Sequence, residues 1–464
     1  MKQLLIYIIG ILLWCSSMTA AAVTYSGTLP VVFINASDSI TSKENYIDAT
    51  FYIDDMGCEG FSSVGSADDP LPLLIRGRGN WTWFGPFEKK AYKIKLEEGL
   101  PLLGMGKNKH FALLAHADGN NPFFRNTAGF ELSRLLELDF TPEQQPVELV
   151  LNGEYQGLYF LTETVRVGKR RVNIVEQKDY ETNTDSITGG WLLEIGNASD
   201  EHQLKMNVSG TTLQYWWITY HSPENLSNEQ RNYLRYQMTR ILAMVYNSNK
   251  TSTAWPSMLD LDNLTRFYLI HEMLDNIEAF LGSCYFFKDY KADKWKFGPV
   301  WDCGSALNQW HRKDWFIYQY DNGWQPCIME EIAKFPVFQN SVRQLWYSEA
   351  HRLYTELTSH LTAFAAQIKA AAACDYERWP QYGVADIDKM LARCMSLLKE
   401  KELFLVSQWG EYNGYSDMAN VKVKQPVDNH IYNLQGQRLF SPPARGLYIQ
   451  NGRKIIVKNG QRIN

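Results

Sequence analysis

Hydrophobic and polar residues alternate along several short segments in the first half of the chain. A period of two is typical of strands that bury one face, and turn-forming residues bound these segments. Asn152-Gly153 separates the last two segments and is a strong signal for a tight hairpin turn. We expect strands at residues 29–35, 46–54, 71–76, 89–96, 107–115, 147–152 and 155–161, and a helix at 125–138.

The pattern changes after about residue 228, where apolar residues recur at helical intervals. Pro336 suits the first turn of a helix and not its interior, so it marks the start of one of these segments. A hairpin is expected before it, with strands at 284–288 and 295–301. We expect helices at residues 228–247, 261–274, 337–371 and 385–405.

These patterns divide the chain into two lobes and a tail. A β-rich lobe covers residues 23–220, a mainly helical lobe covers 221–424, and a small all-β module covers 425–464. The fold class is therefore α+β. The junction of two such lobes is a usual place for a nucleotide cleft.

The first 22 residues have the character of a signal peptide. Lys2 precedes an apolar stretch at 4–14, and small residues at 20–22 suit cleavage. Trp14 stands before Cys15, where lipidation would need a small residue. We expect a mature chain that begins near Val23, has no transmembrane helix and is exported to the periplasm, the cell surface or the medium.

Composition narrows the classes of function. A net charge of −5 gives no overall basic field for nucleic acid. Aromatic residues make up 14% of the chain, which is common in secreted and carbohydrate-handling proteins. The cysteines beyond the signal peptide are sparse and lack CxxC spacing, so we expect mostly buried thiols with one or two disulfides at most. No HExxH or Gly-x-Ser-x-Gly motif supports a zinc enzyme or a serine hydrolase.

Candidate chemistry centres on the predicted hairpin. Glu278 is followed five positions later by Ser283, and the return strand leads into Asp302-Cys303-Gly304. Protein kinases place a catalytic acid, a metal ligand, a strand pair and a metal-binding Asp in this order. Asp302 is either a metal ligand or a solvated loop acid, and Glu278 is either a general base or a helix-terminal acid. Ser283 is either a structural residue, which the sequence favours, or a metal ligand.

A second group of candidates is basic. Arg76, Arg78 and Asn80 lie in a glycine-rich turn that suits phosphate contact, although solvated arginines in a tight turn are the alternative. Lys93 follows on the next predicted strand, and a strand lysine there is a candidate partner for Glu163, as in the lysine–glutamate pair of kinases. The sequence does not choose between Lys93 and its neighbours Lys90 and Lys95.

Many short segments, in order, carry a family resemblance over about half the chain. Residues 73–308 resemble the CotH family, the spore-coat-type secreted protein kinases with a divergent two-lobed kinase-like fold. The matching segments are 75–83, 89–96, 103–104, 107–110, 112–115, 124–126, 148–163 and 189–194, together with Asp118 and Trp301-Asp302.

This resemblance implies a kinase that uses ATP with Mg²⁺ or Mn²⁺. It aligns Asp302 with the metal-binding Asp of the family. Glu278 falls on the catalytic Asp position, Ser283 on an Asn, and Gly304 where a second acid is common. These departures leave two hypotheses open: an atypical Ser/Thr kinase that acts on an exported or envelope protein, or a pseudokinase that serves as a surface binding or structural protein.

Two further segments bear on partners and export. The Trp-rich segment 301–324 suggests a surface glycan as a partner under the second hypothesis. The tail, with the segments 431–438 and 446–448, resembles the C-terminal sorting domains of type IX secretion.

Overall fold

The computed structural model describes residues 25–118, 121–196, 202–207, 215–308, 313–319 and 327–415, together with short strands between 431 and 463. The expected signal peptide and parts of the Trp-rich segment lie outside these residues. The described residues fall into two compact units, 1–413 and 414–464.

The N-terminal strands form a closed barrel. Neighbouring strands pair antiparallel in the order β1-β2-β3-β4-β5-β7-β6, and β6 closes the barrel by pairing parallel with β1. Strands were predicted at every one of these positions, but the closure was not. The strands are β1 (Val31–Ala36), β2 (Ile47–Asp54), β3 (Leu71–Gly77), β4 (Tyr92–Leu100), β5 (Asn108–Leu114), β6 (Gln144–Leu151) and β7 (Glu154–Glu163).

Local chemistry explains the barrel. Asn152 and Gly153 both have left-handed backbone angles, as a two-residue hairpin turn requires, so the predicted turn is confirmed. Inward-facing residues such as Ile94 and Phe111 are at most 1% exposed and belong to one apolar core. Because side chains alternate along a strand, Lys93 next to Ile94 faces outward.

A second sheet has the strand order β12-β11-β8-β10-β9. The predicted hairpin supplies its first two strands, and segments between residues 191 and 222 supply the other three, which the sequence analysis did not predict. The strands are β8 (Trp191–Ile195), β9 (Gln203–Asn207), β10 (Tyr215–Ser222), β11 (Cys284–Lys288) and β12 (Lys296–Phe297).

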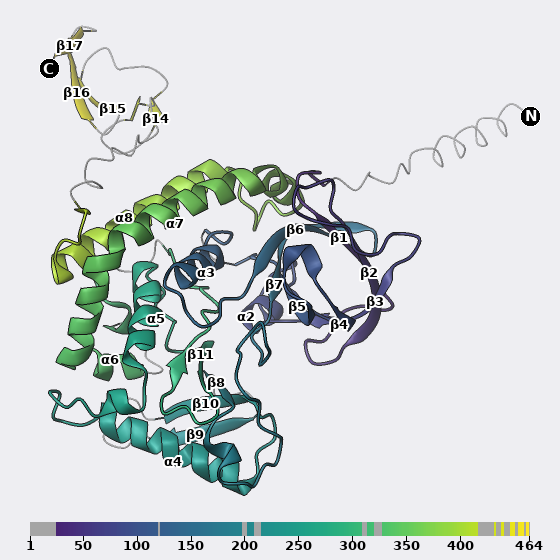
Figure 1. Cartoon of the computed structure of the whole chain (residues 1–464). Helices are drawn as coiled ribbons and strands as arrows, with labels where there is room; N and C mark the ends of the chain where they lie inside the picture. The colour runs from purple at the N-terminus through teal and green to yellow at the C-terminus, as the bar shows by residue number, and fades with distance from the viewer. Residues whose placement is uncertain are drawn as a thin grey trace, which may run out of the picture. The chain divides into compact units, whose positions relative to one another are not determined.

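Helices dominate the later part of this unit, as expected. Side chains of Ser227, Asp260 and Asp386 cap the starts of α4, α5 and α8, and Pro336 opens α7. The long helices α7 and α8 run side by side in Figure 1. The helices are α2 (Trp81–Phe84), α3 (Arg125–Leu135), α4 (Asn228–Val245), α5 (Leu261–Met273), α6 (Ile328–Ile332), α7 (Pro336–Arg378) and α8 (Ile387–Trp409), and short 3₁₀ helices cover Leu102–Gly104, Ser186–Thr188, Trp255–Ser257 and Ile317–Gln319.

A buried ion pair fastens α7 to the barrel. The Lys89 amine lies 2.6 Å from the Asp375 carboxylate, and both side chains are 1% exposed. Asp375 also accepts the Leu158 N–H at 2.9 Å. Gly157 makes this approach possible, because a Cβ there would lie 2.1 Å from Asp375 Oδ1. Lys89 was predicted to begin a strand, but β4 starts only at Tyr92.

The second unit contains the tail. Its described strands form an antiparallel sheet in the order β14-β13-β15-β16-β17, in agreement with the predicted β character. They are β13 (Ile431–Tyr432), β14 (Arg438–Leu439), β15 (Gly446–Gln450), β16 (Arg453–Lys458) and β17 (Gln461–Ile463). Among the described residues, no helix is both long and apolar enough to cross a bilayer.

Candidate active site

The structure brings Ser283 and Asp302 together. Ser283 stands just before β11 and Asp302 follows β12, so the hairpin sets them side by side. The Ser283 hydroxyl donates to Asp302 Oδ2 at 3.3 Å. Both residues have left-handed backbone angles, with φ of 52° and 57°. Such conformations are uncommon outside glycine and cluster at functional sites.

Helix α3 holds the Asp302 loop in place. Asn126 Oδ1 accepts the Cys303 N–H at 2.8 Å, and the Arg125 guanidinium donates to the Gly304 carbonyl. Gly129 lets the helix come close, because a Cβ there would lie 2.4 Å from Cys303 Sγ. The triplet 124–126 carried the family resemblance, but the sequence gave no sign of what Arg125 and Asn126 contact.

Glu278 lies in the loop that follows α5 and is exposed. Its backbone N–H donates to Ser305 Oγ at 3.2 Å. Although the residue as a whole is exposed, the surrounding protein partly removes water from its carboxylate, and this desolvation raises the pKa of Glu278. The nearby Asp302 charge raises the pKa further, and the Arg125 charge opposes the shift. Glu278 and Asp302 therefore share one electrostatic site.

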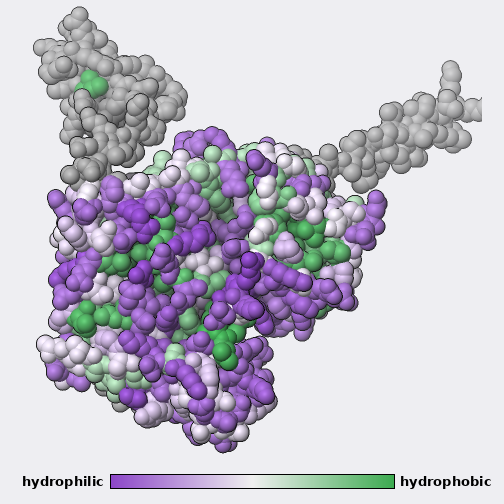
Figure 2. Space-filling view, viewed as in Figure 1, coloured by the Kyte–Doolittle hydropathy of each residue, from purple (hydrophilic) through white to green (hydrophobic). Residues whose placement is uncertain are grey.

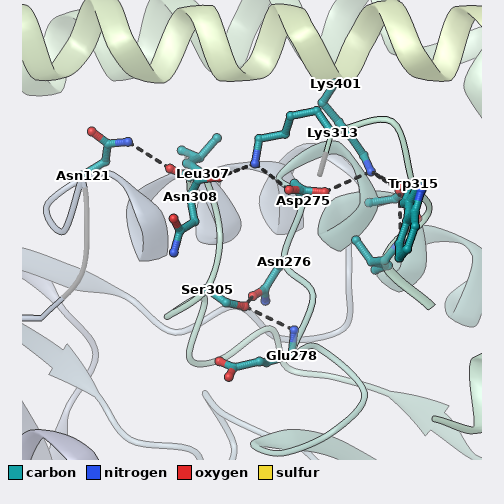
Figure 3. A network of polar contacts seen from close by, with 12 residues as sticks. Asn121, Asp275, Asn276, Glu278, Ser305, Leu307, Asn308, Lys313, Trp315 and Lys401 are labelled. Carbon is teal, nitrogen blue, oxygen red and sulfur yellow. Dashed lines mark hydrogen bonds and ion pairs between the residues drawn. The ribbon is translucent and has the colours of Figure 1, made fainter. Parts of the chain in front are cut away.

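A buried polar network fixes the backbone next to Glu278 (Figure 3). Asp275, which is 2% exposed, lies 2.6 Å from the Lys313 amine and 3.1 Å from the Lys401 amine. Asn276 Oδ1 accepts the Ser305 hydroxyl at 2.6 Å. Asp275 and Asn276 thus serve this network, while the Glu278 carboxylate points away from the two lysines in Figure 3.

Helix α8 joins this network through Lys401. Its amine pairs with Glu272 as well as with Asp275, and it donates to the Trp315 carbonyl at 2.7 Å. Burial raises the pKa of Glu272, and the Lys401 charge opposes that shift. Because these buried charges are paired and hydrogen-bonded, their burial does not leave an unpaired ion in the core. The same contacts connect α5, α8 and the Glu278 loop.

Among the three candidates in the glycine-rich turn, Arg78 extends to the site around Asp302. Its guanidinium lies 5.8 Å from the centre of the Trp301 ring. Burial lowers the pKa of Arg78, and the charge of Asp302 opposes that shift. Arg76 instead donates to the carbonyls of Lys43 and Glu44.

Asn80, the third candidate of that turn, is also directed elsewhere. Its Oδ1 accepts the Lys43 amine at 2.6 Å. The structure therefore separates the three predicted phosphate contacts, since Arg78 alone among them lies beside Asp302.

Lys93 belongs to a cationic cluster on the outer face of β4. Burial, together with the charges of Arg76, Arg166 and Arg78, lowers the pKa of Lys93 to about 8. Glu224 opposes the shift. Glu44 lies 3.6 Å from Arg76 and Asp302 faces Arg78, so the four cations outnumber these acids by one, and the remaining positive charge favours an anionic ligand.

The predicted lysine–glutamate pair takes a different form. Glu163 is 2% exposed, lies 3.8 Å from the Arg171 guanidinium and accepts the Asn108 amide. Lys90 donates to the Trp83 carbonyl at 2.8 Å. The sequence could not indicate this, because Arg171 lies in a turn that resembles a solvated basic segment.

A polar group on the second sheet was also missed. Glu194 on β8 lies 2.6 Å from His221 Nε2 on β10. Tyr285 on β11 pairs with Glu194 in the sheet, and its ring centre lies 5.3 Å from that of His221. Burial and the Glu194 charge raise the pKa of Tyr285, and the charge of Arg78 opposes the shift. These residues extend the polar surface next to Asp302.

The oxygen donors suit a hard divalent cation. An exposed carboxylate beside a hydroxyl matches the few protein ligands that Mg²⁺ uses when phosphate oxygens and waters complete its shell. Within the described residues, no group of three or more His, Cys, Asp or Glu side chains could hold a metal ion by itself. The six cysteines from Cys58 to Cys394 are free thiols, so the disulfides allowed for are not formed.

Comparison with known proteins agrees with the resemblance read from the motifs. The family model described as CotH kinase protein matches residues 75–402, which include the end of β3, the barrel strands β4 to β7, the second sheet and most of the helices. No curated protein matches the chain. The family match suggests protein kinase activity and implies the use of ATP.

Proposed function

We propose that this chain, which belongs to the CotH kinase family, transfers the γ-phosphoryl group of ATP to a Ser or Thr hydroxyl of an exported or envelope protein. The observation that supports this most is the Ser283–Asp302 contact at 3.3 Å. It gathers two oxygen donors at one end of the hairpin, beside Glu278 and Arg78.

The proposal assigns each residue a role in holding ATP. Asp302 and Ser283 offer oxygens to Mg²⁺ or Mn²⁺, which neutralises charge on the phosphates when bound. Arg78 and Lys93 bring positive charge to the same side of the site, and Arg166 adds to it. Lys93 contributes through its charge on the outer face of β4, while Glu163 stabilises the barrel through Arg171.

Glu278 serves as the proton acceptor in this scheme. The acceptor hydroxyl oxygen forms a bond to the γ-phosphorus, the bond from the γ-phosphorus to the bridging oxygen breaks, and ADP leaves. The hydroxyl proton passes to the Glu278 carboxylate. The raised pKa of Glu278 makes it a better base than an ordinary glutamate, as long as the pH keeps it ionised.

A second candidate is a pseudokinase that acts as a surface binding or structural protein. Gly304 has no carboxylate where a second acid is common, and the Glu163 pair involves Arg171 instead of a β4 lysine. Under this second hypothesis the partner is a surface glycan, which binds in a hollow of about 390 Å³. The hollow is lined by Asp314, Trp315, Phe316, Gln319, Phe404 and Gln408.

Export is part of the proposal. The signal-peptide character of residues 1–22 supports it, and the tail that resembles a type IX sorting domain suggests a route. N-terminal sequencing of protein from the native envelope should give a start near Val23, and an acylated start at Cys15 would contradict this.

Phosphoryl transfer tests the proposed activity directly. The mature protein is incubated with γ-labelled ATP, Mg²⁺ or Mn²⁺, and casein as a general acceptor. We expect label on Ser or Thr of casein or of the protein itself. If the protein binds nucleotide but transfers no label with either Mg²⁺ or Mn²⁺, the pseudokinase hypothesis replaces the kinase hypothesis.

A further inference from the structure

The loop between β3 and β4 presents two large apolar side chains to solvent. Trp81 is 65% exposed and Phe84 is 73% exposed, both within the short helix α2. Hydrophobic residues are scattered in small patches over the mainly hydrophilic face in Figure 2. Exposed aromatic side chains in a fixed position mark an interaction surface more often than isolated aliphatic residues do.

Contacts on both sides hold this loop firmly. Trp83 packs against the barrel core and lies over Gly77, where a Cβ would come within 2.4 Å of its ring. Phe87 contacts the rings of Trp81 and Tyr382, at 5.7 and 5.8 Å between centres. The Tyr382 hydroxyl donates to the Pro86 carbonyl at 2.8 Å. The exposure of Trp81 and Phe84 is therefore built into a packed loop.

This aromatic pair is close to the candidate active site along the chain. Arg78 precedes Trp81 by three residues, and its guanidinium lies over Trp301 beside Asp302. Three residues of chain span at most about 11 Å. The Arg78 side chain covers the remaining way to Trp301 and Asp302. An extended acceptor segment with its hydroxyl at Asp302 can therefore also contact Trp81 and Phe84.

Charge around the pair indicates what kind of partner fits. The Lys43 amine lies 5.2 Å from the centre of the Phe84 ring, and the Lys90 amine lies 5.7 Å from that of Trp83. The cationic cluster around Lys93 is on the strand that follows. Glu44 lies 3.7 Å from Lys43 and 3.6 Å from Arg76 and offsets part of this charge, but the cations outnumber it. An aromatic surface with a net cationic edge complements a segment that is apolar and acidic.

We propose that segment 81–84 is the docking surface for the acceptor polypeptide. It binds a large apolar side chain of the acceptor, a few residues from the reacting hydroxyl and flanked by acidic residues. This inference rests on the proposed kinase function. It adds a rule for the acceptor that the family match does not contain.

An array of immobilised 12-residue peptides tests this proposal by binding. Each peptide has a central Ser, and the other positions carry Ala, Phe, Leu, Glu or Lys one at a time. Labelled wild type in the presence of ATP analogue and Mg²⁺ should prefer Phe or Leu at one fixed offset from Ser, and Glu next to it. We expect the double variant Trp81→Ala/Phe84→Ala to lose this preference at least tenfold.

Controls separate this inference from the proposed function. Tyr347→Ala removes another aromatic side chain, 59% exposed on α7, and should leave the peptide preference unchanged. Nucleotide affinity, measured on every variant, should equal that of wild type, because Trp81 and Phe84 do not hold ATP. If wild type itself binds no nucleotide, the proposed kinase function is overturned, whatever the peptide array shows.

Three outcomes would overturn the docking inference while nucleotide binding is intact. The first is a peptide array without any positional preference, and the second is a preference that survives in the double variant. The third is binding of wild type, but not of the double variant, to phosphatidylglycerol vesicles without any peptide preference. That last result would assign the loop to a membrane surface.

Discussion

Single residues decide whether this site can act on ATP. Asp302 is held in a left-handed conformation next to Ser283, and Arg78 lies beside them. Glu278 replaces the shorter Asp expected at its position, so its carboxylate extends one methylene further toward solvent. In the proposed scheme Asp302 is the acid for the metal and Glu278 is the acid for the proton, and the Glu278 side chain is the longer of the two.

Glu278→Gln should spare nucleotide binding and slow phosphoryl transfer by about 10²–10⁴-fold, because a general base contributes on that order. The wild-type acid limb of transfer should lie at a higher pH than an ordinary glutamate gives, since the pKa of Glu278 is raised. Transfer falls as the pH drops through that pKa, where the carboxylate becomes protonated. Rate profiles against pH check both expectations, and an equal loss of nucleotide affinity would place Glu278 in binding.

At the scale of elements, the site depends on helices that carry no reacting group. Helix α3 fixes the Asp302 loop through Arg125 and Asn126. Helix α8 fixes the Glu278 loop through Lys401. Mutation of outer contacts of this kind typically lowers the metal affinity of a site by about 10- to 100-fold.

Asn126→Ala should weaken metal-dependent nucleotide binding about tenfold or more, because the Cys303 N–H loses its acceptor and Asp302 is less well placed. Asn126→Asp keeps an acceptor oxygen and should retain most of the affinity. Calorimetric titration measures both variants, and thermal melting shows whether the fold is intact. Equal weakening by the two variants would mean that the hydrogen bond is not what matters.

Lys89→Met should destabilise the protein by about 3–5 kcal/mol, since it leaves the buried Asp375 carboxylate without its cation. The double variant Lys89→Met/Asp375→Leu should recover part of the loss. Lys369→Met breaks the exposed pair with Asp388 and serves as the matched control, for which we expect no measurable change. Chemical unfolding measures the free energies. A loss in the control as large as in Lys89→Met would refute the role of burial.

Elements were more predictable from sequence than their contacts. Alternation located the barrel strands, and Pro336 located the start of α7, because both signals are local. Closure of the barrel by β1 and β6 and the pairing of Lys89 with Asp375 join positions far apart in the chain. Local periodicity carries no information on such contacts. The sequence likewise placed Ser283 and Asp302 correctly around the hairpin, but it could not separate Arg78 from Arg76 and Asn80.

At the scale of the whole molecule, residues 1–413 and the unit that contains the tail, 414–464, are each compact. Deletion of residues 427–464 should therefore change the melting temperature of the rest by only a few degrees, because small modules at chain ends share few core contacts. About 1 kcal/mol shifts the melting temperature of a medium-sized domain by a few degrees. Melting of the truncated protein is the measurement, and a drop beyond about 10 °C would make the tail part of the main fold.

Nucleotide titration of wild type and Asp302→Asn is the most direct test of this account. Affinity for ATP is measured with Mg²⁺, with Mn²⁺ and with EDTA, and melting confirms that both proteins are folded. We predict that wild type binds ATP only with a divalent cation, and that Asp302→Asn loses this binding because an amide of the same shape brings no charge to the ion. Equal binding by both proteins would contradict the assigned site, and no binding by wild type with either metal would contradict the kinase function.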